Sequence, residues 1–259
     1  DSIRRLDGVL EREILGGGGP QGAFGARLWS PKVGFITRTG DVVEEKPLAA
    51  LHALDVDLRG WYSFPNVRQP HGGMEYDENE YMRPRTGIAP DMQLLSQEIR
   101  ELLKQDTPIP PAYATPRVIH LITEYYDDRI YHDALALKQQ GVIFSVEPLI
   151  DYRAWTNRDA TLEAMATWDI ISPDWPSASG LAGSEDPATV LRFFSERGPA
   201  LVTVRHGARG SYVWDSVTGK AWHMPPSPVI AVDPTGAGNA YAGGAMVGWD
   251  LHRDGRFAA

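Results

Sequence analysis

Short apolar runs alternate with amphipathic segments through the second half of the chain. The apolar runs are rich in Val, Ile and Leu, which predicts buried strands, whereas the longer segments between them repeat apolar residues at helical spacing. This alternation predicts an α/β fold with a central, mostly parallel sheet that helices cover on both faces. The predicted strands are 118–122, 142–146, 169–172 and 200–204, and the predicted helices are 128–140, 159–167 and 187–197.

The first hundred residues are less regular. Residues 56–90 are polar, aromatic and rich in Gly, Pro and Arg, and such a segment is too long for an ordinary connection, so we expect a lid or binding loop there. Near the other end, Thr218-Gly219 predicts the turn of a hairpin. The remaining predicted strands are 9–15, 33–37, 211–214, 220–223 and 229–232, and the remaining predicted helices are 21–29, 47–54, 92–104 and 240–251.

Composition excludes several classes of function. The chain has 259 residues and a net charge of -9, which argues against a general affinity for nucleic acid or anionic membranes. It has no cysteine, so disulfides, zinc–thiolate sites and thiol nucleophiles are excluded. No apolar run is long enough to span a membrane. We expect no metal site among the histidines, because their spacing fits no ligand pattern; they include His120, His132, His206 and His223.

The sharpest chemical signal is the glycine-rich segment from Asp233 to Asn239, which precedes the last predicted helix. Glycines ahead of a helix leave backbone N–H groups free, with the positive end of the helix dipole behind them. Because Cβ atoms are missing, an anion can approach this backbone closely, so the segment predicts a phosphate site. Taken alone, these residues leave open an ordinary glycine-rich turn capped by Asn239.

This segment resembles the D-T-G-A-G-D signature of the ribokinase, or PfkB, family of carbohydrate kinases. Asn239 stands where the signature ends in Asp. The glycine run 16–19 with Gln21, and the turn 207–213, resemble two further motifs of the family. The resemblance covers nearly the whole chain. The matching residues of the signature are Asp233, Thr235, Gly236, Ala237 and Gly238.

Three details resemble one subgroup of that family. They are the polar run 76–80, the apolar run 118–121 and the pair Glu147-Pro148. The subgroup comprises the fungal and algal ribokinase-like proteins that include the yeast maintenance-of-killer factor.

The resemblance implies a three-layer ribokinase-like sandwich with a small β lid. It implies a single domain over 1–259, incomplete at both ends, with lid segments at approximately 4–15 and 56–90. The implied reaction is phosphoryl transfer from ATP to a sugar or nucleoside hydroxyl, with Mg²⁺ and optionally a monovalent cation. The implied site residues are Gly236, Ala237 and Gly238 as anion hole, Asn239 at the position of the catalytic base, Thr203, Gly207, Gly210 and Thr235 beside ATP, and Asp1, Gly17, Gln21 and Asp233 beside the sugar.

Three departures from the family pattern argue against ordinary kinase activity. Asn239 can orient a hydroxyl but cannot accept its proton, and general-base catalysis typically contributes about 10²–10⁴-fold. The family's Asn-x-x-Glu motif falls at 174–177, where the Glu is absent, and Gln21 replaces an Asn. Two hypotheses remain, an impaired sugar or nucleoside kinase and an inactive pseudokinase that serves as a scaffold or regulatory subunit. A dinucleotide-binding oxidoreductase is disfavoured, since no G-x-G-x-x-G follows an early strand.

Partners and compartment follow from these interpretations. We expect a sugar or nucleoside and ATP as ligands, no membrane and no nucleic acid, and either a homodimer formed through the lid or a protein partner. No signal peptide is visible, so an intracellular, cytoplasmic location is the default. Because the chain begins with Asp1, we expect residues to be missing there, which leaves an organelle open.

Overall fold

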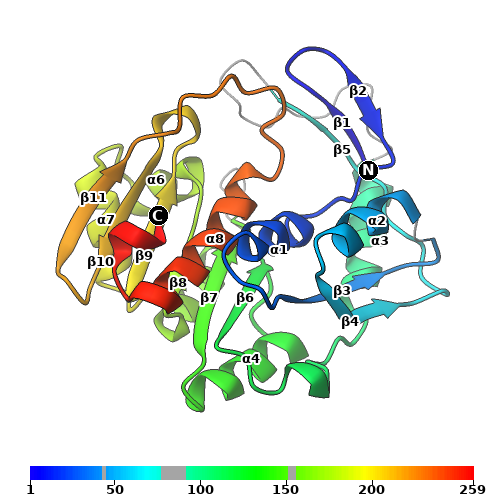
Figure 1. The fold of residues 1–259 in the computed structure, drawn as a ribbon, viewed down its shortest axis with the longest axis horizontal. Coiled ribbons are helices and arrows are strands. Elements are labelled where there is room, and N and C mark those ends of the chain that lie inside the picture. Colours follow the sequence, from blue (N-terminus) through cyan, green and yellow to red (C-terminus); the bar gives the residue numbers. More distant parts are fainter. Residues whose placement is uncertain (43–44, 77–91, 151–155) are drawn as a thin grey trace.

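The computed structural model describes residues 1–42, 45–76, 92–150 and 156–259. Its centre is a six-stranded sheet in the order β11-β10-β9-β8-β7-β6 (Figure 1). Strands β6 to β9 are parallel, whereas β10 is antiparallel to both β9 and β11. The α/β prediction is therefore confirmed. The strands are β6 (Val118–Thr123), β7 (Ile143–Pro148), β8 (Ile170–Ile171), β9 (Leu201–Arg205), β10 (Ser211–Asp215) and β11 (Lys220–Met224).

Side chains of the sheet alternate between two apolar cores. Phe144 packs on one face with Phe194, whereas Ile143 packs on the other face with Trp249. Both faces of the sheet are thus covered, which explains why the strands are apolar runs. Helices on the first face are α4 (Arg129–Gln139), α5 (Arg158–Ala164), α6 (Trp175–Ala182) and α7 (Pro187–Ser195); those on the second are α1 (Gly19–Arg27), α8 (Ala237–His252) and α9 (Gly255–Ala258).

Helices α1 and α8 lie against each other through glycines. A Cβ at Gly25 would lie 2.6 Å from the carbonyl carbon of Ala240, and a Cβ at Gly243 would lie 2.9 Å from the carbonyl carbon of Gly22. Only glycine allows backbones to approach so closely. The contact brings the glycine run ahead of α1 beside the glycine-rich segment ahead of α8, and this juxtaposition builds the site.

The N-terminal part adds two small sheets. Strands β3 (Gly34–Thr39) and β4 (Asp57–Ser63) pair in parallel beside α2 (Glu45–Ala53) and α3 (Met92–Leu103). A three-stranded sheet, β2-β1-β5, stands apart from the central sheet (Figure 1). Its strands are β1 (Ser2–Arg4), β2 (Leu10–Arg12) and β5 (Gly73–Glu75). We call it the small sheet. Between β1 and β2, the Leu6 N–H donates to the Val232 carbonyl over 3.0 Å, just ahead of the glycine-rich segment.

The predicted binding loop at 56–90 holds more regular structure than we expected. Strands β4 and β5 lie inside it: β4 pairs in parallel with β3, and β5 pairs in parallel with β1. Residues 77–91, including most of the polar run 76–80, lie outside the described residues.

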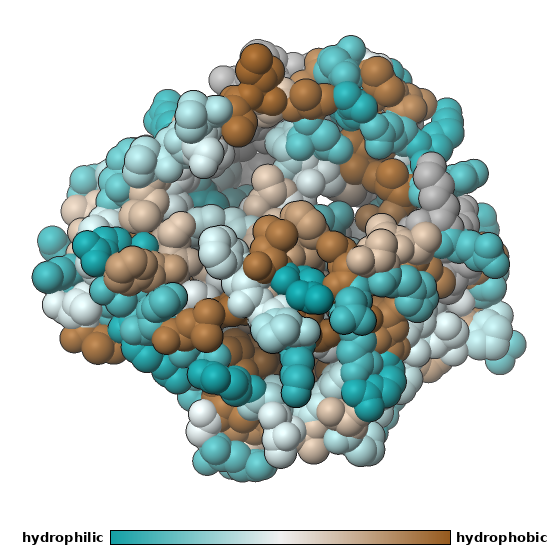
Figure 2. Space-filling view, in the orientation of Figure 1, coloured by the Kyte–Doolittle hydropathy of each residue, from teal (hydrophilic) through white to brown (hydrophobic). Residues whose placement is uncertain are grey.

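Three other predictions need correction. Residues 229–232 form no strand, and Val229 and Ile230 are 78% and 94% exposed. The connection from β11 to α8 runs along the top of Figure 1, and Figure 2 shows hydrophobic side chains on the surface there. Helix α8 begins at Ala237, three residues earlier than predicted. Helix α6 was missed, although Asp174 caps it by accepting from Ser177 N–H over 3.1 Å, followed by Trp175-Pro176. In the described part of the chain, every helix is too short or too polar to cross a membrane.

Candidate active site

The start of helix α8 presents free backbone donors. Gly236 precedes it in a left-handed conformation, φ 78°, that favours glycine. Among the described residues, no acceptor pairs with the N–H groups of Gly236, Gly238 or Asn239, whereas Ala237 N–H donates to the Pro234 carbonyl over 3.1 Å. Free N–H groups at the positive end of a 16-residue helix form a site suited to an anion.

The cation Arg205 reinforces this site. It ends strand β9, and its guanidinium lies so close to Gly238 that a Cβ there would collide with it. Its side chain is only 15% exposed. A guanidinium beside the positive end of a helix is unfavourable unless negative charge lies nearby. One such charge is Glu147 Oε1, 2.8 Å from Arg205 Nη2.

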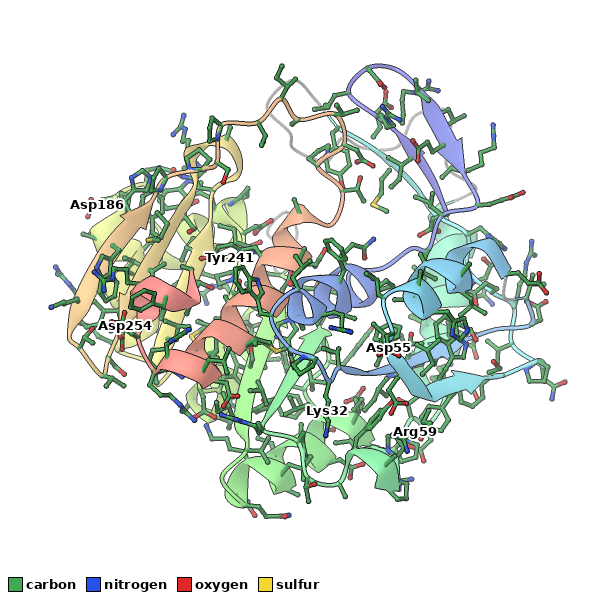
Figure 3. All side chains as sticks on the ribbon, in the orientation of Figure 1. Lys32, Asp55, Arg59, Asp186, Tyr241 and Asp254 are labelled. Carbon is green, nitrogen blue, oxygen red and sulfur yellow. The ribbon has the colours of Figure 1, made fainter. Side chains whose placement is uncertain are left out.

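Asn239 sits in the first turn of α8 and reaches the same carboxylate. Its Nδ2 donates to Glu147 Oε1 over 2.8 Å. On the opposite side, a Cβ at Gly18 would lie 2.5 Å from that Nδ2 and 2.9 Å from Cγ. Asn239 is therefore held between the start of α1 and the end of β7. Nearby, the Tyr241 ring points from α8 toward the sheet, where its hydroxyl lies 3.0 Å from Ser211 Oγ (Figure 3).

Glu147 is the buried carboxylate of the site. The residue is 3% exposed, and burial raises its pKa, while Arg205 and the hydrogen bond from Asn239 counteract that rise. His120 Nε2 lies 4.0 Å from its second oxygen, Oε2, and neither atom has a hydrogen-bond partner among the described residues. Burial lowers the pKa of His120 to about 4, so this imidazole is neutral near pH 7.

A cleft lies next to Asn239. Its lining includes Asp1, Gly17, His120, Gly236 and Asn239. The predicted sugar-side residues therefore divide into two groups. Asp1 and Gly17 line the cleft, and Asp1 Oδ1 also accepts from Gly72 N–H next to the small sheet.

Gln21, in helix α1, packs against the glycine-rich segment, and Asp233 lies at the start of that segment. The Gln21 side chain occupies the space where a Cβ of Gly236 would be, and its Oε1 is buried. Asp233 is exposed, and its Oδ1 accepts from Thr235 N–H over 2.9 Å, which closes a turn. Neither Gln21 nor Asp233 is among the described residues that line the cleft.

The predicted nucleotide-side residues lie mostly at the carboxyl end of β9. Gly207 and Gly210 bound a tight turn there and both have positive φ, 52° and 85°. Thr235 lines the cleft. Thr203 is fully buried within β9, with Oγ1 3.4 Å from the Ile171 carbonyl oxygen.

An aromatic stack borders the same turn. His206 stacks on Trp175 with ring centroids 4.3 Å apart and planes 6° from parallel. Trp175 opens helix α6, and its Nε1 donates to Glu185 over 3.0 Å. This rigid pair links the end of β9 to the helix that the sequence did not predict.

Sequence reasoning missed the roles of Glu147, Arg205 and His120. Glu147 served only as a mark of the subgroup. One signal could have found it: a lone carboxylate at the end of the apolar run 142–146. The carboxyl ends of parallel strands meet at one edge of the sheet, and the ends of β7 and β9 both lie at that edge.

Comparisons with known proteins point the same way. The family described as pfkB family carbohydrate kinase matches residues 100–258, more than half of the chain. A cytidine kinase of Thermococcus kodakarensis is 28% identical over 243 residues, which are 93% of this chain and 83% of that protein. A ribokinase II from E. coli, solved with ATP and Mg²⁺, superimposes with a TM-score of 0.72 at 20% identity, covering 97% of this chain and 80% of that chain. A fructokinase from Vibrio cholerae, solved with fructose, ADP and calcium, gives a TM-score of 0.70 at 18% identity, covering 98% and 82%.

Proposed function

Because the chain belongs to the PfkB family of carbohydrate kinases, we propose that it transfers the γ-phosphoryl group of ATP to a hydroxyl of a sugar or nucleoside. The observation that carries this proposal is the set of free N–H groups at the start of α8, beside a cleft and next to Arg205. Such donors stabilise the negative charge on a phosphoryl group in transfer. The cytidine kinase and fructokinase relatives support both acceptor classes.

Each part of the site has a role in this proposal. The N–H groups of Gly236 and Gly238 bind the transferring phosphoryl group, and Arg205 adds positive charge behind them. Asn239 stands where the family signature has its catalytic Asp, and it accepts a hydrogen bond from the attacking hydroxyl. Because an amide is not a base, we expect turnover slower by a factor within the range of about 10²–10⁴ that general-base catalysis contributes.

The residues present fit nucleotide phosphates better than they fit a metal ion bound by the protein alone. Among the described residues there is no group of three His, Asp or Glu side chains that could hold a metal ion. Mg²⁺ keeps several waters and binds substrate phosphates with few protein carboxylates, so it would arrive with ATP and neutralise phosphate charge. A monovalent cation remains a prediction from the family resemblance.

A second candidate function rests on Asn239 and on the absence of Glu at 174–177. In this alternative the protein is a pseudokinase, which keeps the fold and serves as a scaffold or regulatory subunit. It predicts no turnover and a stable protein partner. The homodimer through the lid and the maintenance-of-killer subgroup likewise remain predictions.

The first test is ADP release with ATP, Mg²⁺ and a panel of sugars and nucleosides. Release that depends on one acceptor supports the kinase, and silence with every acceptor contradicts it. Nucleotide binding is measured in parallel with Gly238→Ala, which adds a Cβ in the anion site beside Arg205. Gly244→Ala is the control, because Gly244 lies on the same helix as Gly238. Its Cβ would lie 3.4 Å from Trp29, which is an ordinary contact. We expect weakened binding only in Gly238→Ala.

A further inference from the structure

Glu147 lies directly behind Asn239 and has no part in the proposed function so far. We propose that Glu147 is a positioning residue: its carboxylate holds the Asn239 side-chain amide so that Oδ1 faces the acceptor hydroxyl. The inference rests on the proposed kinase function and explains how a chain with Asn239 can still orient its acceptor.

Hydrogen-bond chemistry fixes the orientation of the Asn239 side-chain amide. An ionised carboxylate only accepts, whereas a side-chain amide donates through nitrogen and accepts through oxygen. Because Glu147 Oε1 lies 2.8 Å from the Asn239 amide, the NH₂ group must point to the carboxylate. Oδ1 then points away from Glu147, and no hydrogen bond to it is present in the described part of the chain. Since Asn239 lines the cleft, Oδ1 is left to accept from a ligand.

The surroundings prevent the amide from turning away. Gly18 lies close to the amide: a Cβ built at Gly18 would be 2.5 Å from Asn239 Nδ2 and 3.2 Å from Ile122 Cδ1. The helix backbone of α8 is fixed in turn by its glycine contact with α1. A side chain confined in this way loses little entropy when it binds a hydroxyl.

Two neighbours of Glu147 oppose the rise in its pKa that burial causes, and two do not. Arg205 pairs with it from β9, Asn239 donates to it from α8, and the neutral His120 faces it from β6. Asp174, ahead of α6, opposes ionisation through its own negative charge. Burial raises the Glu147 pKa, so protonation at acid pH would free the carboxyl group to donate and would release the amide. A carboxylate bonded to Nδ2 also makes Oδ1 a stronger acceptor, because hydrogen bonds in a chain polarise one another.

This arrangement changes what restoring the family's Asp should do. Asn239→Asp places a second carboxylate against Glu147, and two close carboxylates share one proton rather than both ionise. When Glu147→Gln is added, the NH₂ group of the new amide can donate to the carboxylate that Asn239→Asp introduces. The double variant therefore regains one hydrogen bond between positions 147 and 239, with the carboxylate at position 239 and the amide donor at position 147. We expect the effect of Asn239→Asp to depend on the residue at position 147.

The test compares Glu147→Gln, N239D and the double variant E147Q/N239D with the native chain, by kcat and KM across pH. We expect E147Q to lower kcat by about 10-fold, the equivalent of one buried hydrogen bond to a charged group. We expect the double variant to exceed both single variants, and the acid limb of the native pH profile to vanish in E147Q. Native kcat and pH profile in E147Q, or equal gains from N239D in both backgrounds, would overturn the inference.

A control separates positioning from stability. Asp215→Asn makes the same carboxylate-to-amide change at another buried residue, which is 0% exposed. Asp215 pairs with Leu201 at the start of β9, so it lies at the end of the sheet away from the site. It should lower stability and leave the pH profile unchanged.

A second measurement does not need turnover. In NMR spectra, we expect the Asn239 side-chain NH₂ signals to shift as Glu147 is protonated at acid pH, and to show no such titration in E147Q. Identical titration in native protein and E147Q would refute the positioning role even if no acceptor is found. Conversely, a silent ADP-release panel with the expected NMR titration would refute the proposed function alone.

Discussion

The contact between α1 and α8 yields a sharp prediction about packing. Gly243 and Gly244 are neighbours in helix α8, but they face different surroundings. A Cβ at Gly243 would lie 2.9 Å from the Gly22 carbonyl carbon and 3.1 Å from Ala26 N, and closer still to the Gly22 carbonyl oxygen. A Cβ at Gly244 would lie 3.4 Å from the edge of Trp29. Replacing each glycine by Ala should therefore have opposite effects on stability.

The magnitudes follow from two opposing effects. Replacing Gly by Ala inside a helix stabilises it by about 1 kcal/mol. Overpacking costs about 1–3 kcal/mol even where side chains can yield, and at Gly243 the obstacle is the backbone of α1, which yields less. We expect a net loss of at least about 1–2 kcal/mol for Gly243→Ala and a gain of up to about 1 kcal/mol for Gly244→Ala.

The assay is unfolding of both variants and the native chain by denaturant, which gives the free energy, and by heat, which gives Tm. A loss of about 1–2 kcal/mol corresponds to a decrease in Tm of roughly 2–8 °C for a chain of this size. Because the contact also places Asn239, Gly243→Ala should weaken nucleotide binding as well. Equal stability of the two variants, or a more stable Gly243→Ala, would show that the helices do not touch through these glycines.

Three further predictions concern buried polar groups. Asp215 accepts from Val217 N–H over 2.8 Å and from Gly255 N–H over 3.0 Å, so Asp215→Asn should cost about 1–3 kcal/mol in the free energy of unfolding, measured by denaturation. Burial raises the pKa values of Tyr126 and Tyr241 to about 12, above their unfolded value of about 10, so stability should fall as pH rises from 10 to 12. An absorbance titration in which both tyrosines ionise near pH 10 without unfolding would contradict this. The pKa of His120 is lowered to about 4, so stability present above pH 6.5 should be lost as pH falls toward 4, and His120→Asn should reduce that slope in acid unfolding.

Much of the fold could be predicted because local patterns carry it. The strands at 118–122, 142–146 and 200–204 are apolar on both faces, and a strand with that pattern must lie inside a covered sheet. Helix α6 was missed because only Trp175 and Leu181 of its buried residues are large and apolar; the others, Ser177, Ala178 and Ser179, are small and give little apolar periodicity. Residues 229–232 were wrongly predicted as a strand, because apolar composition alone does not say whether a partner strand is present.

By itself the sequence predicted which backbone could hold an anion, because glycines ahead of a helix leave N–H groups free, and this depends only on nearby residues. The resemblance to the family signature also predicts that Asn239 stands at the position of the catalytic Asp. Only the tertiary structure decided what surrounds Asn239. Glu147 is 92 residues away along the chain and Arg205 is 34 away, and they meet because β7 and β9 end at the same edge of the sheet. The environment of a buried carboxylate depends on such distant partners, since burial and charge act through space rather than along the chain.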